Sequence, residues 1–299
     1  MSEQTKIAWC DSTLNWWEGC TRISEGCRFC YAEARDKRFT GGKLWGKGAP
    51  RRKSKSAVKS ALAMNRKPWI CDKCGEARAN SHEACCWTEE NPVTSHRRRI
   101  FSLSLGDWLD DEVPVEWLAR MLDTIRQCDQ VVWILCSKRP ENFFSRMLEA
   151  QATAANSLPE FRPLMVWIGD WLDGVPPSNI ILLTSVENQE MADKRIPELL
   201  KIPAVCHGLS LEPLLGPVTI NQWGAGGPTL PTLEWLIIGC ESGAKRRDCK
   251  LAWVRNLVAQ AEHAGVARFV KQLQDSEGLV CKDVSEFPDD LQIQQFPNL

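Results

Sequence analysis

From residue 98 onward the sequence repeats one unit, in which a short apolar run is followed by a polar turn and an amphipathic stretch. Apolar runs bounded by turn signals are typical of strands buried on both faces, and amphipathic stretches are typical of helices. Their alternation predicts parallel βα units. The apolar runs are residues 100–105, 131–136, 180–184, 204–209, 235–238 and 267–270, and the expected helices are 115–128, 141–150, 188–200 and 253–264.

A further strand near residues 7–9 would bring the count to about seven, which predicts an α/β fold with a complete or partial (β/α) barrel. A doubly wound open sheet would give the same alternation. In a barrel the functional residues gather at the carboxyl ends of the strands. Charged residues follow the predicted strands at such positions, and helix capping explains them less well than it explains serine. They are Asp107, Lys138, Glu187, Glu212, Glu241 and Lys271.

Composition narrows the class of protein. The 299 residues carry a net charge of −1, so the whole molecule offers no argument for a nucleic-acid partner. The first residues lack a signal peptide and no apolar run is long enough to span a bilayer, so we expect a cytoplasmic protein with no membrane partner. Fourteen cysteines in such a chain indicate metal binding or redox chemistry rather than disulfides.

Cys20, Cys27 and Cys30 lie in one short segment and are the first candidate metal ligands. Three thiolates in one loop can hold three irons of a [4Fe–4S] cluster and leave the fourth iron without a protein ligand. An open metal position is typical of catalytic sites. A zinc loop, or buried thiols that act as small hydrophobic residues, are the alternatives.

The order Cys27-Arg-Phe29-Cys30-Tyr-Ala, with Asn-Trp-Trp-Glu-Gly before Cys20, resembles the cluster loop of radical S-adenosylmethionine (SAM) enzymes of the spore-photoproduct-lyase type. The first two cysteines are separated by six residues here and by three in that branch. Six further segments make the chain similar to the phage Gp37/Gp68 family (DUF5131), which is of uncharacterised function and is regarded as radical-SAM-like. These segments are residues 106–110, 135–141, 185–189, 209–217, 239–243 and 269–272.

The resemblance implies a mechanism and a set of roles. Cys20, Cys27 and Cys30 would hold a [4Fe–4S] cluster and act in catalysis. SAM would bind the open iron, and an electron donor would reduce the cluster. Cleavage of SAM would then give a 5′-deoxyadenosyl radical. Phe29 would pack beside the cluster and adenine, and SAM or substrate would be held by Ser104, Asp107, Lys138, Glu187, Glu212 and Glu241.

Residues 40–98 interrupt the βα rhythm and are predicted to be a basic, cysteine-rich insertion. On this division residues 1–39 hold the first strand and the cluster loop, and residues 99–299 hold the rest of the barrel and a C-terminal tail. Two basic clusters could contact DNA phosphates, although solvated surface loops are an equal alternative. The clusters are Arg51, Arg52, Lys53 and Lys55, and His96, Arg97, Arg98 and Arg99.

A second cysteine group lies between the two basic clusters. A Cys-x2-Cys pair with a following glycine, and a second pair close behind, predict a zinc site. An auxiliary iron–sulfur cluster is the competing interpretation, and inert thiols are a third. The candidate ligands are Cys71, Cys74, His82, Cys85 and Cys86.

These features predict a radical SAM enzyme that acts on a DNA base or nucleotide derivative, for example by rearranging a modified thymidine in phage DNA. The subclass, whether isomerase, lyase or transferase, stays open, and a phage-encoded protein would work in the host cytoplasm. One alternative is a radical SAM enzyme that acts on a peptide or metabolite. Another is a nucleic-acid-binding protein that holds zinc or an iron–sulfur cluster and has no catalytic activity.

Overall fold

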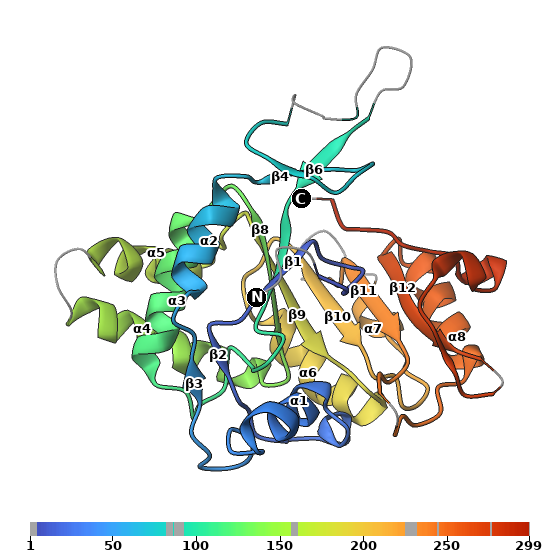
Figure 1. Cartoon of the computed structure of the whole chain (residues 1–299). Coiled ribbons are helices and arrows are strands. Elements are labelled where there is room, and N and C mark those ends of the chain that lie inside the picture. The colour runs from blue at the N-terminus through green and yellow to red at the C-terminus, as the bar shows by residue number, and fades with distance from the viewer. Residues whose placement is uncertain are drawn as a thin grey trace.

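The structure is a computed structural model that describes residues 5–81, 86, 93–156, 161–224, 232–243, 245–275 and 277–298. Its main feature is an eight-stranded sheet in which the first seven strands are parallel and the last is antiparallel (Figure 1). In sheet order the strands are β1 (Ser12–Leu14), β7 (Arg99–Ser102), β8 (Val132–Ser137), β9 (Ile180–Ser185), β10 (His207–Leu211), β11 (Trp235–Gly239), β12 (Ala267–Gln274) and β13 (Val280–Cys281).

Two small sheets stand beside the main one. The first pairs β2 (Trp17–Glu18) with β3 (Arg52–Lys53), and the second sets β4 (Trp69–Cys71) between β5 (Ala77–Arg78) and β6 (Ser95–Arg97). The helices are α1 (Tyr31–Thr40), α2 (Ala57–Asn65), α3 (Val115–Gln127), α4 (Phe143–Ala155), α5 (Arg162–Leu172), α6 (Gln189–Leu200), α7 (Asn221–Gly224) and α8 (Leu251–His263). Short 3-10 helices are η1 (Glu25–Cys27), η2 (Pro140–Asn142), η4 (Val284–Glu286) and η5 (Asp289–Leu291).

The predicted parallel α/β architecture is confirmed, because each of the six apolar runs overlaps a strand of the main sheet. The first strand was predicted at the wrong place. It forms at Ser12–Leu14, whereas residues 7–9 form a turn that carries Trp9, only 3% exposed, into the core. Among the described strands no pairing joins β1 to β13, so these two are edges and no closed barrel is shown.

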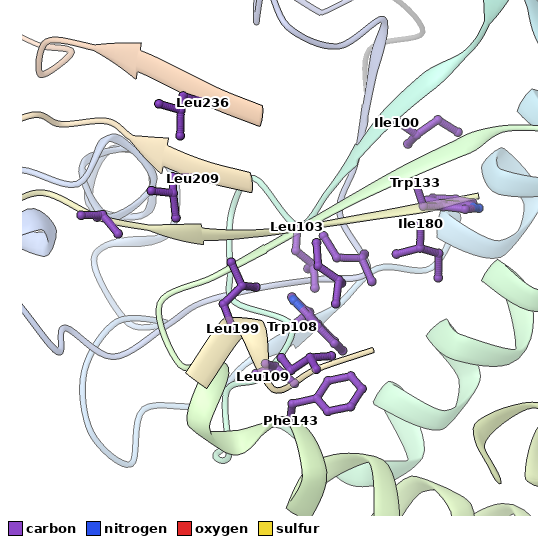
Figure 2. Close-up of a cluster of buried hydrophobic side chains, with 14 of the residues drawn as sticks. Ile100, Leu103, Trp108, Leu109, Trp133, Phe143, Ile180, Leu199, Leu209 and Leu236 are labelled. Carbon is purple, nitrogen blue, oxygen red and sulfur yellow. The ribbon is translucent and has the colours of Figure 1, made fainter. Parts of the chain in front are cut away.

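The strands are buried on both faces, which explains why they are almost continuously apolar. One face packs against the helices through a large cluster that includes Trp133, Leu209 and Leu236 (Figure 2). Neighbouring residues of the same strands, such as Ile134 and Ile237, belong to a second cluster on the opposite face.

The sheet is strongly curled around that second cluster. The ring of Trp9 lies 4.6 Å from the ring of Phe101 in β7 and 6.2 Å from that of Trp235 in β11. These strands are four positions apart, a separation of roughly 19 Å in a flat sheet. Phe296 makes a similar bridge, because its ring contacts Phe269 of β12 and also the guanidinium of Arg99, 3.6 Å from the ring centroid, in β7. Curling lets one aromatic side chain touch both halves of the sheet.

The stretch that was expected to be one insertion divides into two parts. Helix α2 contacts β1 and α3, and Ala57, Ala61 and Met64 of α2 belong to the main core. The small sheet of β4, β5 and β6 instead projects from the amino ends of the main strands, since β6 leads directly into β7 (Figure 1). In the part of the chain that the structure describes, we find no helix with the length and apolar character to cross a membrane.

Candidate functional site

A cavity of about 490 Å³ opens at the carboxyl ends of the parallel strands. Its volume lies in the range of small-molecule sites, which is roughly 300–1,000 Å³. Cys20, Cys27 and Cys30 all line this cavity. Residues in or directly after the strands β7 to β12 supply much of the remaining wall. The cysteine loop therefore faces the rim where the sequence predicts a site.

The cysteine loop begins at a glycine that no other residue could replace without strain. Gly19 has a φ of +114°, and a Cβ placed on it would lie 2.6 Å from the carbonyl oxygen of Leu44. Its amide donates a 3.0 Å hydrogen bond to the carbonyl of Leu105, which fastens the loop to the end of β7. The loop ends at Cys30, which is the N-cap residue of α1.

The six residues between Cys20 and Cys27 are held by polar contacts. Arg22 binds Glu33 of α1 through two hydrogen bonds of 2.6 Å each. The carbonyl oxygen of Thr21 accepts a 2.9 Å bond from Arg139. The long segment between the first two cysteines thus has fixed partners, and all three cysteines line one cavity.

Arg139, at the end of β8, joins the first cysteine to the rim. Its guanidinium lies 3.7 Å from the sulfur of Cys20 and 3.0 Å from a carboxylate oxygen of Asp107. Asp107 also accepts bonds from the hydroxyl of Ser137 at 2.6 Å and the amide of Lys138 at 2.9 Å. Asp107 lines the cavity, but its oxygens already have several protein partners. Its geometry suits a residue that positions Arg139 and Lys138.

The side chain of Glu187 lies behind the cysteine loop, on the side away from the cavity. It is 1% exposed, is absent from the cavity lining, and its carboxylate forms a 2.8 Å ion pair with buried Arg195. The same carboxylate accepts a 3.2 Å hydrogen bond from the amide of Gly26, next to Cys27. Burial would raise the pKa of Glu187, but Arg195 and these hydrogen bonds hold it below its usual value. Glu187 therefore supports the loop as a carboxylate.

The other residues predicted to bind SAM or substrate do line the cavity. Lys138 extends to the hydroxyl of Ser185, 3.0 Å from its Nζ. Glu212, which follows β10, pairs with Lys271 of β12. Glu241 pairs with Arg247, whose guanidinium also lies 5.2 Å from the ring centroid of Phe29. The predicted residues that line the cavity are Phe29, Ser104, Asp107, Lys138, Glu212 and Glu241.

Several cavity residues received no role from the sequence. Trp9 and Gln272 line the cavity and each has a buried polar atom, Nε1 and Oε1 respectively, that lacks a hydrogen-bond partner among the described residues. Buried polar atoms in this state are expected to find a partner in a ligand or water. Gln272 directly follows Lys271 after a predicted apolar run, so the sequence placed it at the rim without giving it a role, and in the structure both residues lie within β12. The position of Trp9 gave no such signal, because residues 7–9 were predicted to form a strand.

Two of the three thiols in the loop have raised pKa values. Burial, together with the nearby Asp107, raises the pKa of Cys20 to about 12. Burial also raises the pKa of Cys30. Metal binding would remove these protons, because thiolates are the ligands. The donor set and the unpartnered Gln272 oxygen fit a cluster with a small polar ligand beside it.

The second cysteine group has a different geometry. The sulfur atoms of Cys71, Cys74 and Cys86 all lie within 4.8 Å of one another, so this triad can hold a metal ion such as zinc. No other group of three cysteine, histidine or carboxylate ligands in the described ranges is as compact. His82 and Cys85, also predicted as ligands, lie outside the described residues.

Most arginines of the two basic clusters have partners within the protein. The side chain of Arg51 is 1% exposed and binds the buried carboxylate of Asp110 at 2.9 Å. Arg52 pairs with Glu18, and Arg97 donates to backbone carbonyl oxygens. Lys53 and Lys55 remain exposed. The prediction of DNA contact therefore depends on these lysines more than on the arginines.

The chain is an α/β protein with a mostly parallel sheet and a cysteine-lined cavity at the carboxyl ends of its strands. Its residues 4–285 match the model of one protein family, described as "Protein of unknown function (DUF5131)", so the chain belongs to that family. Comparison with curated proteins and with solved structures gave no match.

Proposed function

We propose that the protein is a radical SAM enzyme whose [4Fe–4S] cluster is held by Cys20, Cys27 and Cys30. The observation that carries this proposal is that three cysteines of one loop line a single cavity at the carboxyl ends of seven parallel strands. Sites at this rim are the rule for parallel βα barrels. The curling of the sheet around Trp9 and Phe296 supports the further proposal that it is a partial barrel of the radical SAM type.

The sulfur atoms of Cys20, Cys27 and Cys30 do not all lie within 4.8 Å of one another, which suits a cluster better than a single ion. Three thiolates on one tetrahedral zinc lie about 3.8 Å apart, since each Zn–S bond is about 2.3 Å. Among the described residues, only the triad of Cys71, Cys74 and Cys86 approaches that spacing. Thiolates that each hold a different iron of a cubane lie further apart, as three ligands in one extended loop can.

The bound cluster would supply the reductive cleavage of SAM that starts radical chemistry. The chain binds and orients the reactants. Lys138 offers an ammonium for a carboxylate, while Ser104 and Glu212 offer acceptors for an amine. The acceptor oxygen of Gln272 can take a hydrogen bond from substrate. The aromatic wall of Trp9, Phe29 and Phe101 excludes water from the cavity.

We propose a DNA base or nucleotide derivative as the substrate, with rearrangement of a modified thymidine as one reaction. The surface beside the cysteine loop supports this proposal. Helix α1 carries an exposed Phe39, with the guanidinium groups of Arg35 and Arg38 at 5.6 and 5.2 Å from its ring centroid. Lys53 is close by, because Arg35 and Arg52 both bind Glu18. Cations with an exposed aromatic ring suit a single nucleic-acid strand.

Anaerobic reconstitution tests the proposed function. We expect a brown protein with about four irons at the loop, which makes 5′-deoxyadenosine when dithionite and SAM are added. Cys27→Ser should abolish both properties, and the matched variant Cys281→Ser, at a cysteine outside both groups, should keep them. Incubation with phage DNA and mass spectrometry of the nucleosides then tests the substrate. A colourless protein that binds zinc at both cysteine groups would contradict the radical SAM proposal.

A further inference from the structure

The small sheet of β4, β5 and β6 has a metal-binding geometry of its own, far from the cavity. Cys71 ends β4, and Cys74 lies in the turn that joins β4 to β5. The amide of Gly75 donates a 2.9 Å hydrogen bond to the carbonyl of Cys71, and Gly75 has a φ of +71°. This tight turn, which favours glycine, points two thiols three residues apart toward one position. Cys86 brings a third sulfur to the same place.

The compact triad indicates one ion rather than a cubane cluster. All three sulfur atoms lie within 4.8 Å of one another, close to the roughly 3.8 Å that a tetrahedral zinc–thiolate site requires. Soft thiolate ligands select zinc among the common divalent ions that carry no redox chemistry. Cys71 is buried and Cys74 is exposed, as expected of an ion at the base of a surface hairpin.

A chain of polar contacts connects this triad to the main sheet. Asp72 lies between the first two cysteines, and one of its carboxylate oxygens is 2.6 Å from Nδ1 of His96 in β6. Nε2 of His96 lies 3.1 Å from each carboxylate oxygen of Asp11, just before β1. Asp11 in turn accepts a 2.7 Å bond from the amide of Arg99, the first residue of β7. The side chains of His96 and Asp11 therefore connect Asp72 of the cysteine turn to the start of β1 and of β7.

The last contact in this chain reaches the interior of the curled sheet. The guanidinium of Arg99 lies 3.6 Å from the ring centroid of Phe296, which packs on Phe269 and Trp235. The carbonyl of Ile293, in the same C-terminal segment, accepts a 2.8 Å bond from the amide of Val270. Phe296 thus closes the amino end of the curled sheet, and Arg99 holds it there.

We propose that Cys71, Cys74 and Cys86 bind one structural Zn²⁺ ion, and that this zinc site fixes the β4–β6 sheet as a cap on the amino ends of the strands. The ion stabilises the hairpin that carries Asp72, and Asp72 holds His96, Asp11 and Arg99 in register. Each thiol that binds zinc releases its proton to solvent. The cap acts on stability at the end of the sheet opposite to the cysteine-lined cavity.

Metal content tests the binding part of this proposal. Protein purified anaerobically without chelator should hold about one zinc per chain, and Cys27→Ser and Cys281→Ser should retain it. In Cys74→Ser, a change at an exposed position, the zinc content per chain should fall by at least about tenfold. Unchanged zinc in Cys74→Ser would overturn the proposal, as would iron that is retained in Cys27→Ser and lost in Cys74→Ser. Because iron and zinc are measured separately, failure of this proposal is distinct from failure of the cluster at the cavity.

A second measurement covers the case in which Cys74→Ser does not fold. Cobalt added to the zinc-free wild-type protein should produce thiolate-to-cobalt charge-transfer absorption that zinc displaces. Hydrogen exchange then tests the cap. Removal of zinc should speed exchange at the amides of Arg99 and Val270 by about tenfold or more, and leave the centre of α3 unchanged. Zinc binding with no change at Arg99 and Val270 would overturn the capping role.

Discussion

The two cysteine groups differ in spacing, surroundings and place in the fold. The triad of Cys71, Cys74 and Cys86 is compact and sits on a small sheet at the amino ends of the strands. Cys20, Cys27 and Cys30 belong to a longer loop that lines a cavity at the carboxyl ends. Figure 1 shows α1, which follows the cysteine loop, at the opposite end of the molecule from β4 and β6. The comparison teaches that two cysteine groups that look alike in the sequence can differ in geometry and in their place in the fold.

The surroundings of the two groups agree with the different roles that we propose for them. A closed knuckle needs little beyond its ligands and the turn that presents them. The cavity group is instead supported by charged residues that come from distant strands, such as Arg139 and Glu187. Support of this kind keeps a reactive site in one geometry. Four changes test the separation of the two groups, the contacts that support the cysteine loop and the surface beside it.

The largest effect is expected from a loss of one cavity thiolate. Cys27→Ser removes a cluster ligand, so the rate of 5′-deoxyadenosine formation should fall by at least about a hundredfold. The zinc content should stay at the wild-type value, because the triad at Cys71 lies at the other end of the sheet. Chromatography of the nucleoside product and elemental analysis measure the two quantities. Loss of zinc together with iron would show that the two groups are not independent.

A change behind the loop should lower stability strongly. Arg51 and Asp110 form an ion pair with side chains 1% and 0% exposed, and Arg51 also binds Thr21 in the cysteine loop. Arg51→Met would leave the Asp110 carboxylate buried without its partner, which costs about 3–5 kcal/mol of unfolding free energy. Urea unfolding measures this loss of unfolding free energy.

The neighbouring residue provides the control for that change. Arg52 is exposed and pairs with Glu18, so Arg52→Met should cost no more than about 1 kcal/mol. Equal effects of the two variants would contradict the assignment of Arg51 to the support of the loop.

A smaller effect is expected where the loop meets Glu187. A Cβ added to Gly26 would lie 2.9–3.1 Å from the carboxylate atoms of Glu187, which is itself buried and paired with Arg195. Gly26→Ala should therefore cost about 1–3 kcal/mol of unfolding free energy and lower the iron content while zinc is retained. Gly216→Ala is the matched control, since its nearest neighbour would be 3.8 Å away. Full iron incorporation in Gly26→Ala would rule out a close fit between Glu187 and the loop.

The smallest effect concerns the surface around α1 and β3. Replacing exposed Lys53 and Lys55 by glutamine should weaken binding to single-stranded DNA and reduce the slope of log affinity against log salt by about 1–2. Fluorescence titration at several salt concentrations measures the slope. Lys194→Gln, an exposed lysine on α6, should leave it unchanged. A slope that does not respond to the double variant would remove these lysines from the DNA-contact proposal.

Much of the sheet was predictable because its strands are buried on both faces. Runs such as that of β8 and that of β9 are almost entirely apolar, so they stand out against the amphipathic helices. The three-residue β1, with serine and threonine before Leu14, carries no such signal. Helices α1, α2 and α5 were missed as well. Helix α1 is rich in charged residues and α2 lies in a stretch whose basic character hid its small apolar face of Ala57, Ala61 and Met64.

The cavity was predictable in outline and not in detail. Glu187 and Glu212 both follow strands and look alike in the sequence. The structure turns Glu187 toward Arg195 behind the loop, whereas Glu212 lines the cavity beside Lys271. Arg195 lies in the second turn of α6, and only the packing of that helix brings it to Glu187. A local pattern cannot report such a partner.

By itself the sequence determined the parallel α/β class, the rim at the carboxyl ends of the strands and the two groups of cysteines. These features depend on local periodicity and short spacings, which persist whatever the chain does elsewhere. Only the tertiary structure decided that three cysteines of one group share a cavity while the other group lies at the opposite end. The physical reason is that curling of the sheet and the crossing from β6 into β7 set distances between residues far apart in the chain.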